Sequence, residues 1–228
     1  MFNVRNVTKT FCLHHQGGTE ITVLKDASFQ VGYGECVALT GPSGAGKSTI
    51  LRLLYGNYLL QDGYIRIGNT DLAKATPRDI LSMRQSHLGY VSQFLRVLPR
   101  VSTLKVVCEP MLKAGMDAVA AETRAKDLLH KLRIPDRLWH LSPLTFSGGE
   151  QQRVNIARGL GPTYPALLLD EPTASLDAAN RETVLELINV ARQDGAAIIG
   201  IFHDKAAREQ VCDREIDVSN FGVGYVHA

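Results

Sequence analysis

The chain has 228 residues, of which 45% are hydrophobic and 21% are charged, and its formal net charge at pH 7 is +2. This composition is typical of a globular protein that can bury a sizeable core. The small net charge does not favour a nucleic-acid partner, and no apolar run approaches the ~20 residues that span a bilayer, so neither nucleic-acid binding nor direct membrane insertion is expected.

The first residues lack a secretory pattern, and the cysteines form no C-x-x-C pair. We therefore expect free thiols in a reducing cytoplasm rather than disulfides or a metal site, and a cytoplasmic protein. The four cysteines are Cys12, Cys36, Cys108 and Cys212.

The predicted elements alternate between strands and helices along the chain. Apolar and polar residues alternate through residues 2–31, which predicts antiparallel strands. Continuous apolar runs predict buried strands at 36–40, 166–169 and 198–202, as in a parallel sheet. Further predicted elements are a helix starting at 50–54, strands at 63–68 and 87–93, and a helical region over about 103–134 that ends before Pro135.

A glycine-rich stretch joins the predicted strand at 36–40 to the helix that follows, and it fits the pattern G-x-x-x-x-G-K-[ST]. Its glycines let successive N–H groups point into one concavity at the positive end of the helix dipole. Lys47 adds a charge for the β- and γ-phosphates, and the Ser48 hydroxyl can ligate Mg²⁺. The predicted nucleotide-binding residues here are Gly41, Pro42, Ser43, Gly44, Ala45, Gly46, Lys47, Ser48 and Thr49.

Two carboxylates follow the buried strand at 166–169, at the edge of a parallel sheet where ligands bind. Asp170 is predicted to hold Mg²⁺, directly or through water. Glu171 is predicted to act as the general base toward the attacking water. Taken alone, the pair could also be a strand entering a polar loop. Together with the upstream glycine-rich stretch it favours a hydrolytic site.

A second helix start, Ser147-Gly148-Gly149-Glu150, is also able to take a phosphate. Ser147 is a plausible N-cap, and the glycines leave the backbone N–H groups open. One nucleotide has no use for two such sites in one chain, so we expect this one to serve a nucleotide held by a neighbouring chain. An ordinary capped helix start is the alternative.

These motifs occur in the order and approximate spacing of the ABC-type ATPases, which the chain resembles over most of its length. The family pattern usually begins Leu-Ser-Gly-Gly-Gln, where this chain has Phe146 and Glu150. The motifs are the glycine-rich stretch, Gln93, Ser147 to Gln151, Asp170-Glu171, Ser175-Leu176-Asp177 and His203.

The resemblance implies an α/β P-loop NTPase fold with an antiparallel β subdomain and an inserted α-helical subdomain. The nucleotide-binding core would comprise residues 1–93 and 161–217, and the helical subdomain residues 94–160. The tail at 218–228 is left unassigned.

The resemblance further implies ATP and Mg²⁺ as cofactors and a role for each motif. Gln93 would contact Mg²⁺ and the attacking water, and His203 would contact the γ-phosphate and Glu171. Asp177 would lie in a loop that contacts the partner protomer. Phe11 would stack on adenine, although His14 or His15 could replace it and Phe11 could simply pack. The predicted catalytic residues are Glu171, His203, Gln93 and Lys47. The predicted metal ligands are Ser48, Gln93 and Asp170. The predicted cofactor-binding residues outside the glycine-rich stretch are Phe11, Gln93, Ser147, Gly148, Gly149, Glu150, Asp177 and His203.

Residues 86–205 resemble more specifically the PhnL family, the ABC-type subunits of the bacterial carbon–phosphorus lyase system, through the stretches 92–102, 137–146, 151–159 and 195–204. This resemblance implies a soluble ATPase in phosphonate catabolism, at the step that forms ribose 1-methylphosphonate 5-triphosphate. Its partners would be other carbon–phosphorus lyase system proteins and a second ABC subunit, as a homodimer or with a related ABC protein.

Two other functions stay open. One is the ATPase subunit of a membrane transporter of the lipoprotein-release type, and the other is a non-catalytic, ATP-gated docking module. The segment from Phe94 to Val101 interleaves apolar residues with Arg96 and Arg100 directly after Gln93. It is predicted to be a docking surface, unless it packs inward.

Overall fold

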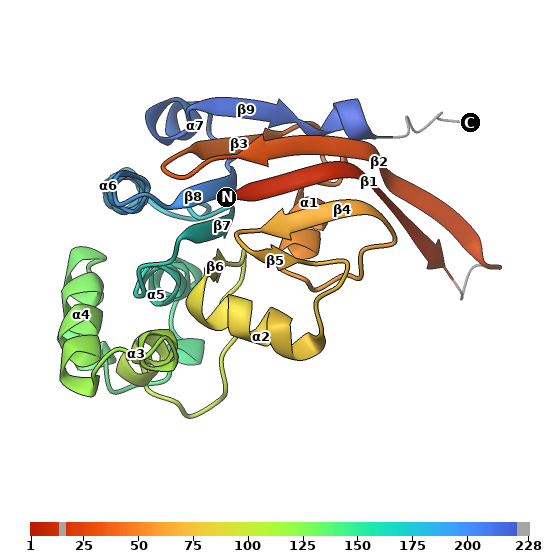
Figure 1. The fold of residues 1–228 in the computed structure, drawn as a ribbon. Helices are drawn as coiled ribbons and strands as arrows, with labels where there is room; N and C mark the ends of the chain where they lie inside the picture. Colours follow the sequence, from red (N-terminus) through yellow and green to blue (C-terminus); the bar gives the residue numbers. More distant parts are fainter. Residues whose placement is uncertain (14–16, 223–228) are drawn as a thin grey trace.

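A computed structural model describes residues 1–13 and 17–222, and two sheets organise the fold (Figure 1). A four-stranded antiparallel sheet has the order β2-β1-β4-β5, and a five-stranded parallel sheet has the order β6-β7-β8-β3-β9. The antiparallel strands are β1 (Phe2–Leu13), β2 (Thr19–Val31), β4 (Asp62–Ile67) and β5 (Thr70–Asp71). The parallel strands are β6 (Leu88–Val91), β7 (Ala166–Asp170), β8 (Ala197–Ile201), β3 (Cys36–Thr40) and β9 (Arg214–Asp217). This arrangement confirms the predicted α/β fold.

The helices pack around the parallel sheet, and α3 and α4 lie together at the end of the molecule away from the antiparallel sheet (Figure 1). The helices are α1 (Lys47–Leu54), α2 (Pro77–Ser86), α3 (Thr103–Lys113), α4 (Ala118–Lys131), α5 (Gly148–Gly159), α6 (Ala178–Gln193) and α7 (Lys205–Val211). Short 3₁₀ turns are η2 (Asp136–Leu138), η3 (Pro143–Thr145) and η4 (Val218–Phe221). None of the helices in the described part of the chain is long and apolar enough to span a bilayer.

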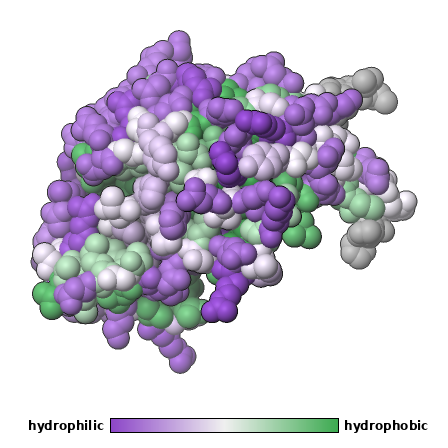
Figure 2. Space-filling view, viewed as in Figure 1, coloured by the Kyte–Doolittle hydropathy of each residue, from purple (hydrophilic) through white to green (hydrophobic). Residues whose placement is uncertain are grey.

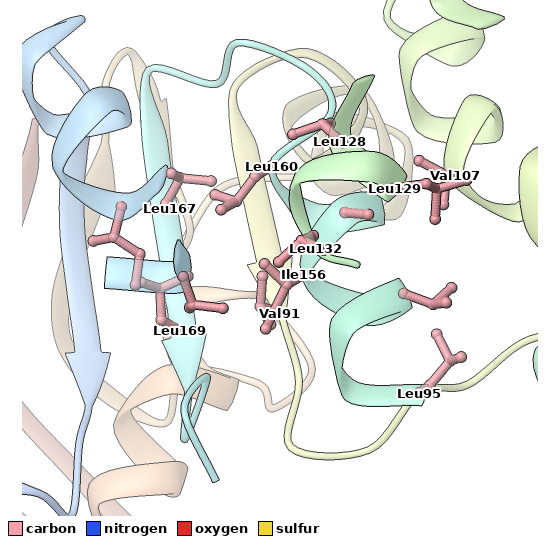
Figure 3. Close-up of a cluster of buried hydrophobic side chains, with 14 of the residues drawn as sticks. Val91, Leu95, Val107, Leu128, Leu129, Leu132, Ile156, Leu160, Leu167 and Leu169 are labelled. Atoms are coloured by element: carbon pink, nitrogen blue, oxygen red, sulfur yellow. The ribbon is translucent and has the colours of Figure 1, made fainter. Parts of the chain in front are cut away.

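Strand β7 explains why the central strands are apolar without alternation. Leu167 and Leu169 belong to a cluster with helices α4 and α5, where Leu128 and Ile156 pack (Figure 3). Leu168, between them in sequence, belongs to a second cluster with α1 and the antiparallel sheet. Successive side chains of a strand point to opposite faces, so a strand covered on both faces needs apolar residues throughout.

Several helices and strands have no counterpart among the sequence predictions: α2, α6, α7, β5 and β9. The helical region predicted over about 103–134 is two helices, and Gly115 with φ +91° lies in the turn between them. Helix α2 has a readable start, because Thr76 and Asp79 form a capping box around Pro77 at its first turn. Strand β9 is a four-residue edge strand with only one buried side chain, too short for a clear pattern.

The surface in the view of Figure 2 is mainly hydrophilic, with apolar patches that include the end formed by α3 and α4. Leu112 on α3 and Val119 on α4 are exposed there. Single exposed apolar residues are ordinary on protein surfaces, so these two carry no functional argument.

Candidate functional site

The glycine-rich stretch, residues 41–49, forms an open loop between β3 and α1 and is called the P-loop below. Gly41, Gly44 and Gly46 all have positive φ, which lets the backbone curl around a concavity. Lys47 donates from Nζ to the carbonyl oxygens of Gly41 and Pro42, at 2.8 Å each, so its ammonium group lies against the loop. The first turn of α1 contains no acidic residue and no side-chain cap, which leaves its N–H groups open to an anion.

Two glycines of this loop are expected to respond differently to alanine. A Cβ at Gly46 would lie 2.9 Å from Val23 Cγ1 and 3.0 Å from Leu24 Cδ2, whereas a Cβ at Gly44 would meet nothing within 4 Å. Both positions have positive φ, so each alanine costs about 1–2 kcal/mol in backbone strain. We expect Gly46→Ala to cost about 1–3 kcal/mol more through overpacking. Denaturant unfolding of the two variants checks this, and equal losses would contradict it.

The carboxylate of Glu171 is hydrogen-bonded to side chains from two other sequence motifs. Gln93 donates from Nε2 to Glu171 Oε2 at 3.1 Å, and His203 donates from Nε2 to Glu171 Oε1 at 2.7 Å. Glu171 follows β7 with φ +54°, an uncommon conformation for a non-glycine residue and one that occurs often at functional sites. The structure therefore brings together three of the predicted catalytic side chains and contains the predicted contact between His203 and Glu171.

Asp170 lies beside Glu171 but is almost fully buried, with 5% of its surface exposed. Its carboxylate accepts a hydrogen bond from the Tyr90 hydroxyl at 3.1 Å. Burial raises the pKa of this carboxyl above its usual value, and the nearby negative charge of Glu171 adds to the shift. A divalent cation at this carboxylate would offset both effects, so the site fits Mg²⁺.

The types of ligand in the site also fit Mg²⁺, and they do not fit a metal ion whose ligands are all protein side chains. Within residues 1–13 and 17–222, no three His, Cys, Asp or Glu side chains are grouped to hold a metal ion. Magnesium is commonly bound by one or two carboxylates together with phosphates, hydroxyls and water. Asp170, Ser48 and the amide oxygen of Gln93 supply that kind of ligand.

The second helix start, Ser147 to Glu150, is a well-formed N-terminus with an open face. The Ser147 side chain accepts from Glu150 N, and Glu150 Oε2 accepts from Ser147 N at 2.9 Å, which completes a capping box. Ser147 also donates from Oγ to Glu150, and these hydrogen bonds lower the pKa of the Glu150 carboxyl. Ser147 and Gly148 are exposed, and a Cβ at Gly148 would meet nothing within 4 Å. The glutamate in place of the usual glutamine therefore supports the helix start locally.

Asp177 caps helix α6, and Asn180 links it to helix α5, which begins at the second helix start. It accepts from Asn180 N at 2.8 Å, and hydrogen bonds from Asn180 hold the pKa of the Asp177 carboxyl below its usual value. Asn180 in turn accepts from Arg153 on α5 at 3.2 Å. A Cβ at Gly149 would lie 3.3 Å from the Ser175 carbonyl, so the loop before α6 packs on the start of α5.

Phe11, the predicted adenine-stacking residue, packs edge-on against Tyr58 with ring centroids 5.2 Å apart, and the Lys9 ammonium lies 5.2 Å from its ring. The ring is half-buried. Its predicted role in stacking on a base stays a prediction. His14 and His15, the alternatives, lie outside the described residues.

The P-loop and the second helix start have different surroundings. Gly41 lies against Asp217 and Ser219, and Gly46 lies against β2. Ser147 to Glu150 instead adjoin the loop before α6. Among residues 1–13 and 17–222, no hydrogen bond or ion pair joins the two. Residues 41–44 of the P-loop are exposed, and so are Ser147 and Gly148 at the second helix start.

Three polar side chains that support the site were not among the sequence predictions. Gln152 on α5 is buried and donates from Nε2 to the carbonyl oxygens of Glu171 and Pro172, at 3.3 Å each. Asn155, three residues on, donates to the Ser92 carbonyl at 2.5 Å, and Tyr90 holds Asp170. The available signal was the polar pair Gln152 and Asn155 at helical spacing in an otherwise apolar stretch, because buried polar groups need partners.

Comparisons with known proteins show the family to which the chain belongs. A family model described as "ABC transporter" matches residues 24–174. The lipoprotein-releasing system ATP-binding protein LolD of Novosphingobium aromaticivorans is 42% identical over 194 residues, which cover 83% of this chain and 85% of that protein. LolD of Zymomonas mobilis is 39% identical and covers 90% of this chain and 88% of that protein.

Solved structures show the same fold. The dimeric structure of MJ0796, a bacterial ABC transporter cassette, superposes with a TM-score of 0.86 at 28% identity, covering 96% of this chain and 95% of that one. A dimeric post-hydrolysis structure of MJ0796 bound to ADP and Pi superposes with a TM-score of 0.87 at 28% identity, with the same coverage.

The comparisons contradict the prediction of a PhnL-family protein. The two relatives described above are both named LolD, at 42% and 39% identity, and neither is named PhnL. Three further predictions depended on that assignment and are not supported either. They are the ribose 1-methylphosphonate 5-triphosphate synthase step, the role in phosphonate catabolism and the carbon–phosphorus lyase partners.

The broader prediction is confirmed by the fold, the family model and the relatives together. Proteins of this kind bind ATP with Mg²⁺ and hydrolyse it. The chain belongs to the ABC transporter family, as one of its ATP-binding cassettes.

Proposed function

We propose that this chain is the ATP-hydrolysing subunit of a membrane transporter of the lipoprotein-releasing type, and that its ATP site is completed by a second ABC subunit. The observation that carries the proposal is the presence of two phosphate-ready helix starts that face different surroundings in one chain. In a dimer, the P-loop of one protomer and Ser147 to Gly149 of its partner would contact the same triphosphate. The dimeric MJ0796 structures and the name of the LolD relatives support this arrangement.

The chemistry follows from the positions of the side chains. The P-loop amides and Lys47 would bind the phosphates, and Ser48, Asp170 and Gln93 would hold Mg²⁺, which offsets phosphate charge when bound. Glu171 would accept a proton from the attacking water. Hydrogen bonds from Gln93 and His203 fix its carboxylate at both oxygens. Such a fixed base contributes about 10²–10⁴-fold to the rate.

The segments that carry Glu171 and Gln93 are both hydrogen-bonded to helix α5. Gln152 holds the carbonyls of Glu171 and Pro172, and Asn155 on the same helix holds the Ser92 carbonyl just before Gln93. Ser147 begins this helix. A change at the terminal phosphate would therefore reach both the second helix start and the segment after Gln93 through direct hydrogen bonds.

The segment Phe94 to Val101, which follows Gln93, has both buried and exposed apolar side chains. Leu95 is buried, with 8% of its surface exposed, whereas Phe94 and Leu98 are 69% and 76% exposed. Helix α5 holds the segment from behind, since Arg158 donates to the Arg96 carbonyl at 3.1 Å. The exposed apolar side chains next to arginines fit a docking surface for the membrane subunit.

Charge reversal tests this surface. We expect the double variant Arg96→Glu and Arg100→Glu to lower affinity for the membrane subunit about tenfold or more, because both arginines are exposed beside Phe94 and Leu98. ATP binding should not change. The matched control is Arg5→Glu with Arg66→Glu, the same charge change on the antiparallel sheet. Co-purification and ATP titration measure the two properties, and equal co-purification of both double variants would contradict the docking role.

The transporter assignment is tested by affinity purification of the chain from its native cells in mild detergent. We expect a subunit with several membrane spans to co-purify, together with ATP turnover that depends on Mg²⁺. Recovery of non-membrane partners alone would contradict the transporter role and leave the ATPase role intact. Absence of turnover in the assembled complex would contradict the ATPase role and favour a docking module.

A further inference from the structure

Two cysteines lie in contact at the start of β3, the strand that leads into the P-loop, and neither is among the residues proposed to bind or hydrolyse ATP. The sulfur atoms of Cys36 and Cys212 are 3.6 Å apart. Cys36 is the first residue of β3 and is fully buried, whereas Cys212 follows α7 and is partly exposed. The cysteines are 176 residues apart in sequence, so the contact depends on the folded chain.

The backbone around the two sulfurs is held in register on both sides. Asp213 donates from its backbone N to the Cys36 carbonyl at 2.8 Å, and Cys36 donates from its backbone N to Asp213 Oδ2 at 2.8 Å. The parallel pairing of β3 and β9 starts at the next residues, Val37 and Arg214. Arg214 also forms an ion pair with Glu35 at 2.6 Å. These contacts keep the two cysteines adjacent without any movement of the strands.

We propose that Cys36 and Cys212 form a reversible oxidation site, which closes to an intramolecular disulfide in the presence of a small disulfide such as oxidised glutathione. An S–S bond is about 2.05 Å long, so the sulfurs must approach by about 1.5 Å. Side-chain rotation about χ1 can provide such a displacement between segments that are already hydrogen-bonded.

The exposures of the two thiols set the order of the exchange. The Cys212 thiolate attacks one sulfur of the small disulfide and releases one thiol, which leaves a mixed disulfide on Cys212. The hydrogen bond to Cys212 and burial together raise the pKa of the Cys36 thiol, so Cys36 is poorly suited to react first. In the second step the Cys36 thiolate attacks Cys212 Sγ and the second small thiol leaves. The two cysteines lose two electrons and two protons, and the small disulfide gains them.

The cross-link would strengthen the attachment of β9, the edge strand whose last residue packs on the start of the P-loop. Strand β9 is at the edge of the parallel sheet and leads directly into η4. A Cβ at Gly41 would lie 3.2 Å from Asp217 Oδ1 and 3.5 Å from Ser219 N, so this segment packs on the first residue of the P-loop. Short edge strands open easily, and a covalent tie to β3 reduces that opening.

The nucleotide groups themselves lie at the other end of the strand. Gly41 is five positions after Cys36, which in a parallel strand is a distance of about 16 Å. The disulfide is therefore expected to change the local stability of residues 213–222 and to leave ATP affinity within about twofold.

The test is incubation of the full chain with oxidised glutathione, followed by mass spectrometry without reductant. We expect a mass loss of about 2 Da, a proteolytic peptide that joins Cys36 to Cys212, and reversal by dithiothreitol. Hydrogen exchange in residues 213–222 should slow about tenfold or more in the oxidised protein. The variants Cys212→Ser and Cys36→Ala should each prevent the cross-link, and Cys108→Ser, in the core of the helical end, should not.

Three results would overturn the proposal. A stable glutathione adduct on Cys212 would show that Cys36 does not complete the exchange. A cross-linked peptide with other cysteines would show that the contact does not direct oxidation. Unchanged exchange in residues 213–222 of the oxidised protein would show that the bond does not hold the edge strand.

Discussion

Replacing Glu171 with glutamine is expected to lower ATP turnover by about 10²–10⁴-fold and to leave ATP binding within about threefold of the wild type. The amide keeps the size of the side chain and can still take part in hydrogen bonds with Gln93 and His203, but it does not accept a proton from water. ATP then stays intact between the two subunits. We expect the variant to accumulate as an ATP-bound dimer, because the nucleotide that joins the protomers is not removed.

Three measurements separate this result from simple damage to the fold. Single-turnover kinetics report the chemical step, ATP titration reports binding, and size-exclusion chromatography with and without ATP reports the dimer. The matched control is Glu186→Gln, the same substitution on an exposed position of α6. Normal turnover in the Glu171 variant would exclude this residue as the base.

Local sequence patterns were sufficient for the elements that carry phosphate chemistry. The P-loop requires glycines at left-handed positions and a lysine at a fixed distance, so its motif is readable without knowledge of the fold. The buried strands β7 and β8 are readable for a similar reason, because coverage on both faces leaves an uninterrupted apolar run. The start of helix α5 was readable from Ser147 as an N-cap, and in the structure Glu150 completes the capping box.

The supporting contacts were not predictable in the same way, because each depends on residues far apart in sequence. Gln152 reaches the carbonyl of Glu171 across 19 positions, and Tyr90 reaches Asp170 across 80. A polar residue on a predicted apolar helix face signals that some partner exists and does not identify it. Strand β9 was missed because pairing with β3, and not its own four residues, makes it a strand.

The phosphate-binding motifs give little information about which protein the chain binds as its partner. The proposed roles of the P-loop, Glu171 and Ser147 concern the nucleotide alone, and they are the same whichever transporter the second subunit belongs to. Under the proposal, docking depends instead on exposed side chains such as Phe94 and Leu98, whose identity is not fixed by ATP. This is why the family followed from the residues while the more specific assignment was contradicted by the relatives.

A composite site predicts that two inactive variants restore activity when they are mixed. Lys47→Ala removes the charge predicted to contact the β- and γ-phosphates, and the lost charge-assisted hydrogen bonds should weaken ATP binding by about 10–150-fold. Gly148→Asp places a carboxylate at the exposed start of α5, where the terminal phosphate of the partner's ATP is expected. A Cβ there meets nothing within 4 Å, and an acidic residue in a first helical turn is favourable, so the fold should be retained.

In a mixed dimer of the two variants, one site combines the intact Lys47 of the Gly148→Asp protomer with the intact Gly148 of the Lys47→Ala protomer. Half of the dimers in an equimolar, freely exchanging mixture are mixed, and each has one complete site of two. We therefore expect about a quarter of wild-type turnover from two preparations that are nearly inactive alone. Gly148→Asn, similar in size but uncharged, is the control and should retain more activity than Gly148→Asp. If the mixture dimerises and remains inactive, or if Gly148→Asp alone hydrolyses ATP normally, the two helix starts do not share a nucleotide between copies of this chain.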